Sequence, residues 1–185
     1  GHAGGIWALK SRGLPCTFST FEVHQQAISL QLRYGEEVWM CTRLYVIPLP
    51  STCSKLWDHF KYRNPLIHQP WMLLRDFDEI IYPTEQCGGF FPNARANVFG
   101  SMIDVCFLFD VYSISSFFTW QKRCRNNVII SRMLDKCLTS DTWKNMFPNA
   151  YVEVLCRMHS NHNPLFLRCD RQENRGVKPF KFEAT

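Results

Sequence analysis

The sequence predicts an α/β fold, in which short strands and amphipathic helices share one hydrophobic core. Three observations support this class. The uninterrupted apolar run at 71–74 is typical of a strand buried on both faces. Apolar and polar residues alternate at 28–32, as they do in a half-buried strand. The segment near 94–107 instead repeats apolar residues at intervals of three and four, which predicts a helix with one core face.

The first part of the chain is predicted to consist of strands. Segments 6–9 and 16–23 have strand composition and are separated by a turn-rich connector. The alternating strand at 28–32 is followed by a turn at 34–37 and a returning strand at 38–46. This order predicts an antiparallel hairpin.

Helices and strands alternate in the middle of the chain. We expect a helix at about 52–63, with Ser51 as its N-cap. Its apolar stripe comprises Leu56, Trp57 and Phe60. The buried strand 71–74, a loop at 86–89 and the helix near 94–107 follow.

Strands are predicted again in the last part of the chain, at 128–133, 151–156 and 165–169. Ser140 is expected to cap a short helix between the first two of them, and Pro148 closes that helix.

Composition indicates a globular domain with a substantial core. The chain has 185 residues, of which 46% are hydrophobic and 20% charged, and this excludes a disordered chain. The formal net charge of +5 is compatible with a polyanionic partner but is weak evidence for one. No apolar run is long enough to span a membrane. The nine cysteines include no Cys-x-x-Cys pair, which argues against a zinc site and a secreted disulfide framework. Reduced thiols in an intracellular protein are expected.

Three carboxylates follow the buried strand: Asp76, Asp78 and Glu79. In an extended segment the side chains of Asp76 and Asp78 point to the same side. Two adjacent carboxylates repel each other unless a cation compensates them, and oxygen ligands suit a hard ion such as Mg²⁺. The alternative is an acidic loop without a ligand.

The segment WMLLRDFDEII, at 71–81, resembles the W-x-x-x-GDFNEI motif of the endonuclease/exonuclease/phosphatase superfamily. The strongest resemblance is to the endonuclease domain of plant LINE-type (non-LTR) retroelements, which is similar to apurinic/apyrimidinic endonucleases. Further segments resemble motifs of that domain in the same order: GGIW at 4–7, LYVIP at 44–48, QCGG at 86–89, ARAN at 94–97, FTW at 118–120, LDK at 134–136, HSNHNPL at 159–165 and KPFKFEA at 178–184.

This resemblance implies a two-sheet, four-layered α/β (α+β) sandwich of the DNase I-like type, with mostly antiparallel sheets and helices outside. It assigns residues 1–170 to the domain and 171–185 to a C-terminal tail. Because GGIW lies inside the family's domain, the resemblance also implies that the first strands of the fold are missing.

The resemblance also implies a site for divalent-metal-dependent hydrolysis of DNA, with Mg²⁺ or Mn²⁺ as cofactor. Asp76 takes the place of the residue that handles the attacking water, and Asp135 that of the carboxylate that orients a histidine. That histidine is His162, which would contact the phosphate, with Tyr45 beside it. The other candidates are Thr119 and Ser160, which would line the site, and Arg95 and Asn97, which would lie near the substrate. Tyr45 could equally be a packing residue, and Arg95 and Asn97 could face solvent.

Several positions depart from the family pattern. Arg75 replaces a glycine, Asp78 replaces an asparagine, and Asn161 replaces an aspartate that binds the metal. The family's metal-binding glutamate and an asparagine of the first strand would precede Gly1. Asp78 and Asn161 are therefore the candidate metal ligands that the sequence retains, and we expect metal binding and activity to be impaired.

The function predicted from the sequence is thus a retroelement-derived endonuclease-like domain, monomeric and nuclear, whose nicking of DNA is weak or absent. Two alternatives stay open. The first is a catalytically inactive domain that binds nucleic acid through basic side chains, namely Arg75, Lys122, Arg123 and Arg125. The second is a non-functional fragment that aggregates through an exposed sheet edge.

Overall fold

A six-stranded mixed sheet lies at the centre of the protein in a computed structural model, which describes residues 6, 8–47 and 49–169. The strand order is β1-β2-β3-β4-β10-β6, and the β3–β4 pair alone is parallel. The strands are β1 Cys16–His24, β2 Ala27–Tyr34, β3 Glu37–Leu44, β4 Trp71–Asp76, β10 Asp135–Ser140 and β6 Leu108–Asp110. The predicted hairpin is confirmed as β2 and β3, which a turn at Gly35 and Glu36 connects.

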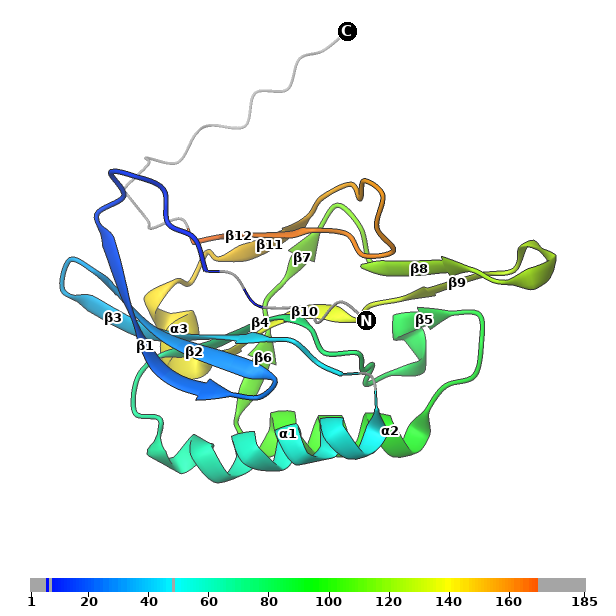
Figure 1. The fold of residues 1–185 in the computed structure, drawn as a ribbon, viewed down its shortest axis with the longest axis horizontal. Helices are drawn as coiled ribbons and strands as arrows, with labels where there is room; N and C mark the ends of the chain where they lie inside the picture. The colour runs from blue at the N-terminus through cyan, green and yellow to red at the C-terminus, as the bar shows by residue number, and fades with distance from the viewer. Residues whose placement is uncertain (1–5, 7, 48, 170–185) are drawn as a thin grey trace, which may run out of the picture.

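Two helices, α1 (Pro50–Arg63) and α2 (Asn93–Val105), cover one face of this sheet, as Figure 1 shows. Their buried side chains pack on Trp71 and Leu73 of β4. These side chains are Leu56, Trp57 and Phe60 of α1, and Phe99 and Met102 of α2. The apolar stripes seen in the sequence are therefore the faces that the helices turn to the sheet.

The predicted N-cap of α1 is wrong. Ser51 lies inside the helix, and Leu49 is the N-cap residue, without a side-chain hydrogen bond. Pro50 begins the helix instead, because its fixed φ suits the first helical position, where its missing N–H costs nothing. The other predicted cap is confirmed: the Ser140 hydroxyl accepts a hydrogen bond from Trp143 N at the start of α3 (Asp141–Met146).

Two three-stranded sheets face the other side of the central sheet (Figure 1). One has the order β12-β11-β7 and the other β5-β9-β8. Their strands are β12 Leu165–Arg168, β11 Tyr151–Val154, β7 Ser113–Ile114, β5 Gln86–Cys87, β9 Ile129–Arg132 and β8 Trp120–Arg123. A second core cluster, which includes Met72, Cys137, Trp143 and Val152, packs between β4, β10 and β11. An isolated antiparallel bridge joins Trp120 of β8 to His162, which lies in the connection between β11 and β12.

Other predicted elements differ from the structure. Ile6, Ala8 and Leu9 form no strand. The sequence did not predict β6, β7, β8 or β10, although β10 lies inside the sheet between β4 and β6. Gln86–Cys87, predicted as part of a loop, form β5. Short 3₁₀ helices occupy some of the connections: η1 Asn64–Leu66, η2 Pro83–Glu85 and η3 Arg125–Asn127.

Some predictions concern residues that the structure does not describe. The GGIW segment lies almost wholly outside the described residues, and the tail 171–185 with its KPFKFEA motif lies entirely outside them. Among the described helices, none has the length and apolar character needed to cross a membrane.

Candidate active site

Asp76 and Asp135 are brought together by strand pairing. Asp76 is the last residue of β4 and Asp135 the first of β10, and the two are register partners in the antiparallel β4–β10 pair. Paired residues present their side chains on the same face of a sheet. The backbone N–H of Asp135 donates to Thr119 Oγ1 at 2.9 Å, so the predicted site residue Thr119 fixes the start of β10.

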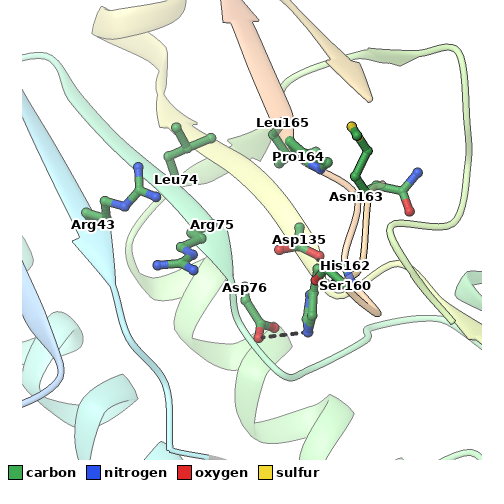
Figure 2. A pocket seen from close by; sticks show the side chains of 11 residues that line it. Arg43, Leu74, Arg75, Asp76, Asp135, Ser160, His162, Asn163, Pro164 and Leu165 are labelled. Carbon is green, nitrogen blue, oxygen red and sulfur yellow. Dashed lines mark hydrogen bonds and ion pairs between the residues drawn. The ribbon is translucent and has the colours of Figure 1, made fainter. Parts of the chain in front are cut away.

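His162 approaches these carboxylates from the connection between β11 and β12, as Figure 2 shows. Its Nδ1 lies 3.0 Å from Asp135 Oδ2, and its Nε2 lies 3.7 Å from Asp76 Oδ2. The bridge to Trp120 holds its backbone, and its N–H donates to Ser160 Oγ at 3.0 Å. One imidazole thus lies between two carboxylates that belong to neighbouring strands.

The surroundings of these groups shift their protonation. Burial, followed by the nearby Asp135 carboxylate, raises the pKa of Asp76 to about 6. A hydrogen bond from the Asp78 backbone N–H to Asp76 Oδ1, at 2.8 Å, and the charge of His162 act against this rise in pKa. The hydrogen bond to Asp135 raises the pKa of His162 above the ordinary value for histidine, although burial opposes it. The site therefore combines a carboxylate that titrates just below neutrality with an imidazole whose charged form is favoured.

A cavity of about 380 Å³ lies beside the three residues. Asp76, Asp135, His162 and Ser160 line one part of it, and Arg43 of β3 and Arg75 of β4 also line it (Figure 2). Arg43 had no signal in the sequence, because a single basic residue near the end of a strand is usually a solvated surface residue.

The backbone of Arg75 has a φ of 129°, in a region that glycine adopts far more readily than other residues. This is the position at which the resemblance showed arginine in place of glycine. Leu74, Arg75 and Asp76 are consecutive in β4, yet all three line the cavity. Regular alternation would place Arg75 on the opposite face, with its register partner Lys136. The unusual φ accompanies this break in the alternation.

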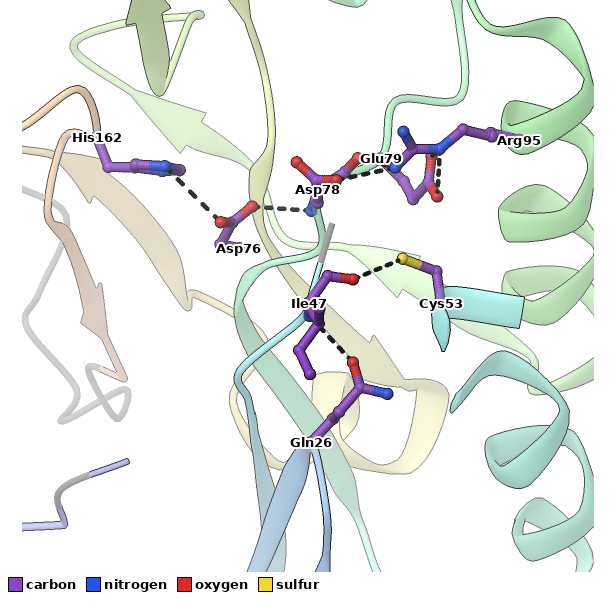
Figure 3. A network of polar contacts seen from close by, with 8 residues as sticks. All are labelled: Gln26, Ile47, Cys53, Asp76, Asp78, Glu79, Arg95 and His162. Carbon is purple, nitrogen blue, oxygen red and sulfur yellow. Dashed lines mark hydrogen bonds and ion pairs between the residues drawn. The ribbon is translucent and has the colours of Figure 1, made fainter. Parts of the chain in front are cut away.

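A second polar network lies next to Asp76 (Figure 3). Asp78, whose own φ is 53°, forms a salt bridge from Oδ2 to Arg95 Nη2 at 2.9 Å. Arg95 Nε also bonds the carboxylate of Glu79, which is 3% exposed, at 3.0 Å. Arg95, predicted near the substrate, is therefore bound by two carboxylates, one of which belongs to the predicted metal ligand Asp78. Glu79 was seen in the sequence only as part of an acidic run.

The remaining predicted residues lie apart from the three that converge. Tyr45 follows β3, is 38% exposed and donates its backbone N–H to Gln26 O. Asn97 is exposed on α2, and Asn161 is exposed with its backbone carbonyl accepting from Gln121 N. Within the described part of the chain, none of these three lines the cavity.

One set of side chains suits a cation. The ligand atoms of Asp76, Asp135 and His162 all lie within 4.8 Å of one another. Two carboxylates and an imidazole fit a divalent ion such as Mn²⁺, whereas Mg²⁺ prefers oxygen ligands alone. The predicted ligand Asp78 is not a member of this set.

Solved structures share this architecture. The endonuclease domain of TRAS1, a telomere-specific non-LTR retrotransposon, superposes with a TM-score of 0.63 at 13% identity, over 84% of this chain and 70% of that domain. A Staphylococcus aureus beta toxin gives a TM-score of 0.51 at 12% identity, over 78% of this chain and 57% of the toxin. These matches confirm the predicted fold class, an α/β fold with mixed sheets. No protein-family model matches the sequence, and neither does any curated protein.

Proposed function

We propose that this chain is a phosphodiesterase-type domain that engages DNA at the Asp76–Asp135–His162 site and nicks it weakly. The observation that carries the proposal is the convergence of these three side chains beside one cavity, on a fold similar to that of a retrotransposon endonuclease domain. A retroelement origin and a nuclear location belong to the same proposal.

The three residues have complementary roles in this proposal. Asp76, with a pKa of about 6, is ionised at neutral pH yet more basic than an exposed aspartate, which suits the removal of a proton from water. Asp135 fixes the orientation of the imidazole and favours its charged form. Protonated His162 would offset negative charge on the phosphate. A divalent cation held by Asp76 and Asp135 would add Lewis-acid stabilisation of the phosphate oxygens.

Three features support weak activity. The Asp78 carboxylate is bound by Arg95, so it offers a poor ligand to a cation. Asn161 supplies no negative charge and faces solvent. The positive charge of Arg75, which lines the cavity next to Asp76, repels a cation there. Each of these features weakens the binding of a metal at the site.

The test is nicking of supercoiled plasmid by the purified chain with Mg²⁺ or Mn²⁺. We expect slow nicking, which Asp76→Ala and His162→Ala each reduce by at least about 100-fold, because each removes a group that acts in proton transfer or charge stabilisation. Asp104→Ala removes an exposed carboxylate of α2 and should leave the rate unchanged. Nicking that survives in both site variants would assign the activity elsewhere.

A second candidate function is binding of DNA without cleavage. The observation that favours it is the exposed basic end of β8, where Lys122 and Arg123 face solvent beside the exposed Arg125. Binding that falls steeply with salt, with no nicking in either metal, would support this candidate. Absence of binding at low salt would remove it.

A further inference from the structure

Two guanidinium groups line the active-site cavity without a partner of opposite charge. The side chains of Arg43 and Arg75 form no salt bridge or hydrogen bond within the part of the chain that the structure describes. Arg43 Nε is moreover buried and has no hydrogen-bond partner. A buried hydrogen-bond donor without a partner lowers the stability of the fold, and a bound ligand, ion or water can supply the missing acceptor.

The two groups are neighbours. β3 and β4 run parallel with Arg43 opposite Leu74, so Arg75 follows directly after the register partner of Arg43 (Figure 2). Burial and the charge of Arg75 lower the pKa of Arg43, which shows that the two positive charges repel each other. An anion bound between them would offset this repulsion.

The carboxylates of the cavity do not compensate this charge. Asp135 lies 3.0 Å and Asp76 3.7 Å from the His162 ring, so both are directed to the imidazole. Arg43 and Arg75 therefore leave two positive charges for a ligand. An internal phosphodiester carries one negative charge, whereas a phosphate monoester carries close to two at neutral pH. Planar guanidinium groups also match the geometry of phosphate oxygens.

We propose that Arg43 and Arg75 form an anion subsite that binds the terminal phosphate monoester of a nucleic-acid strand. The inference rests on the proposed function for the identity of the ligand as nucleic acid, and it adds a preference for strand ends. Apolar side chains of the same cavity, Leu74, Pro164 and Leu165, offer surface for the sugar next to that phosphate.

The test measures binding, not cleavage. Fluorescence anisotropy in EDTA compares a short labelled single strand that carries a terminal phosphate with the same strand ending in a hydroxyl. We expect the phosphorylated strand to bind about tenfold more tightly, as a charge-assisted contact predicts. Arg43→Leu and Arg75→Gly should each abolish the preference, and Arg33→Leu, which removes an exposed arginine of β2, should keep it.

Other results of the binding experiment would contradict the proposed subsite. Equal affinity for the two strands, or a preference that persists in both site variants, would overturn the subsite. Displacement of the phosphorylated strand by inorganic phosphate at equal affinity would show that the subsite serves the free ion and not a strand end. Circular dichroism confirms that each variant is folded, and Arg75→Gly guards against misfolding because the backbone there favours glycine.

The outcome is separable from that of the proposed function. Asp76→Ala should abolish nicking while it keeps the preference for a terminal phosphate, because Asp76 is not part of the subsite. A wild-type protein that prefers terminal phosphate but never nicks would retain the subsite and refute the nuclease proposal. A wild-type protein that nicks DNA but shows no preference for terminal phosphate would support the nuclease proposal and refute the subsite.

Discussion

At the scale of single residues, Arg75 combines an unfavourable backbone with a side chain that lines the cavity. A non-glycine residue at a φ of 129° costs of order 1–3 kcal/mol, and the protein tolerates this cost at a site where the side chain reaches the cavity. Backbone strain of this kind is concentrated at functional sites in proteins, which agrees with the anion subsite assigned to Arg75.

Arg75→Gly should therefore stabilise the fold while it weakens anion binding. We expect the free energy of unfolding to rise by about 1 kcal/mol, since relief of backbone strain exceeds the entropic cost of glycine. Urea unfolding monitored by circular dichroism measures this change. Arg75→Ala is the matched control, because it removes the same guanidinium but keeps Cβ and thus the strain. A glycine variant less stable than the alanine variant would show that the backbone is not strained, because only the entropic cost of glycine would then remain.

The titration of Asp76 and His162 predicts how stability varies with pH in the absence of metal. The pKa of Asp76 rises on folding from an ordinary 3.8 to about 6, so its contribution is present at low pH and is lost as the pH rises through that window. The pKa of His162 also rises on folding, so its contribution is lost as the pH increases through the folded value.

Asp76→Asn should remove the loss of stability that titration of Asp76 causes as the pH rises. At pH 7 we expect the variant to be more stable than the wild type by roughly 2 kcal/mol, and the difference should vanish below the unfolded pKa of 3.8. Guanidinium unfolding of the variant and the wild type at several pH values in EDTA measures the difference in the free energy of unfolding. Asp104→Asn, on an exposed carboxylate, controls for net charge. A stability gain that does not depend on pH would point to packing instead of titration.

At the scale of elements, the sequence predicted the strands and helices whose apolar pattern is regular. β4 followed from the run at 71–74, and the two long helices followed from their stripes. β10 was missed because its buried residues are largely polar: Asp135, Lys136 and Thr139. Each of them is satisfied by a partner far away in the sequence, which a local pattern cannot reveal.

The sequence likewise predicted some residues of the candidate site and missed others. The order of the motifs singled out Asp76, Asp135 and His162. Strand pairing brings the two aspartates together, and the connection between β11 and β12 brings His162 to them. Their roles stay predictions. The Arg95 salt bridges and the position of Arg43 could not be foreseen, because they depend on how α2 and β3 lie against β4.

The alternating pattern of β2 predicted the strand correctly. The polar residue Ser29 is nevertheless buried on this strand, where its hydroxyl forms a hydrogen bond with that of Thr42.

The ion pair beneath the site stabilises β10 against η2. The Lys136 side chain is fully buried, and its Nζ lies 2.8 Å from Glu85 Oε1. The other Glu85 oxygen accepts from Ile81 N at 2.7 Å. Removing one member leaves the other as an uncompensated buried charge.

Lys136→Met should therefore destabilise the protein by about 3–5 kcal/mol. Adding Glu85→Gln should restore much of this loss, because glutamine keeps an acceptor for Ile81 N but carries no charge. Thermal unfolding of both single variants and the double variant forms a double-mutant cycle. Additive losses would mean that the two side chains are not coupled.

At the scale of the whole molecule, the central sheet presents an open edge. In the part of the chain that the structure describes, β1 pairs with β2 alone. Its exposed apolar side chains include Phe18, Phe21 and Val23, the last of them 72% exposed. Unpaired strand edges act as templates for association, and charged residues on them prevent it.

We expect the protein to be a monomer at micromolar concentration and to associate through β1 as concentration rises. Sedimentation velocity over a concentration series measures this, and Val23→Lys should shift association to higher concentration because a lysine on the edge disfavours strand pairing. Tyr62→Lys is the matched control, since it places the same charge on an exposed apolar position of α1. Weaker association in the Tyr62 variant alone would place the contact on the helix layer. A wild-type monomer that unfolds cooperatively would count against a non-functional, aggregating fragment, because such a fragment would lack one cooperative core.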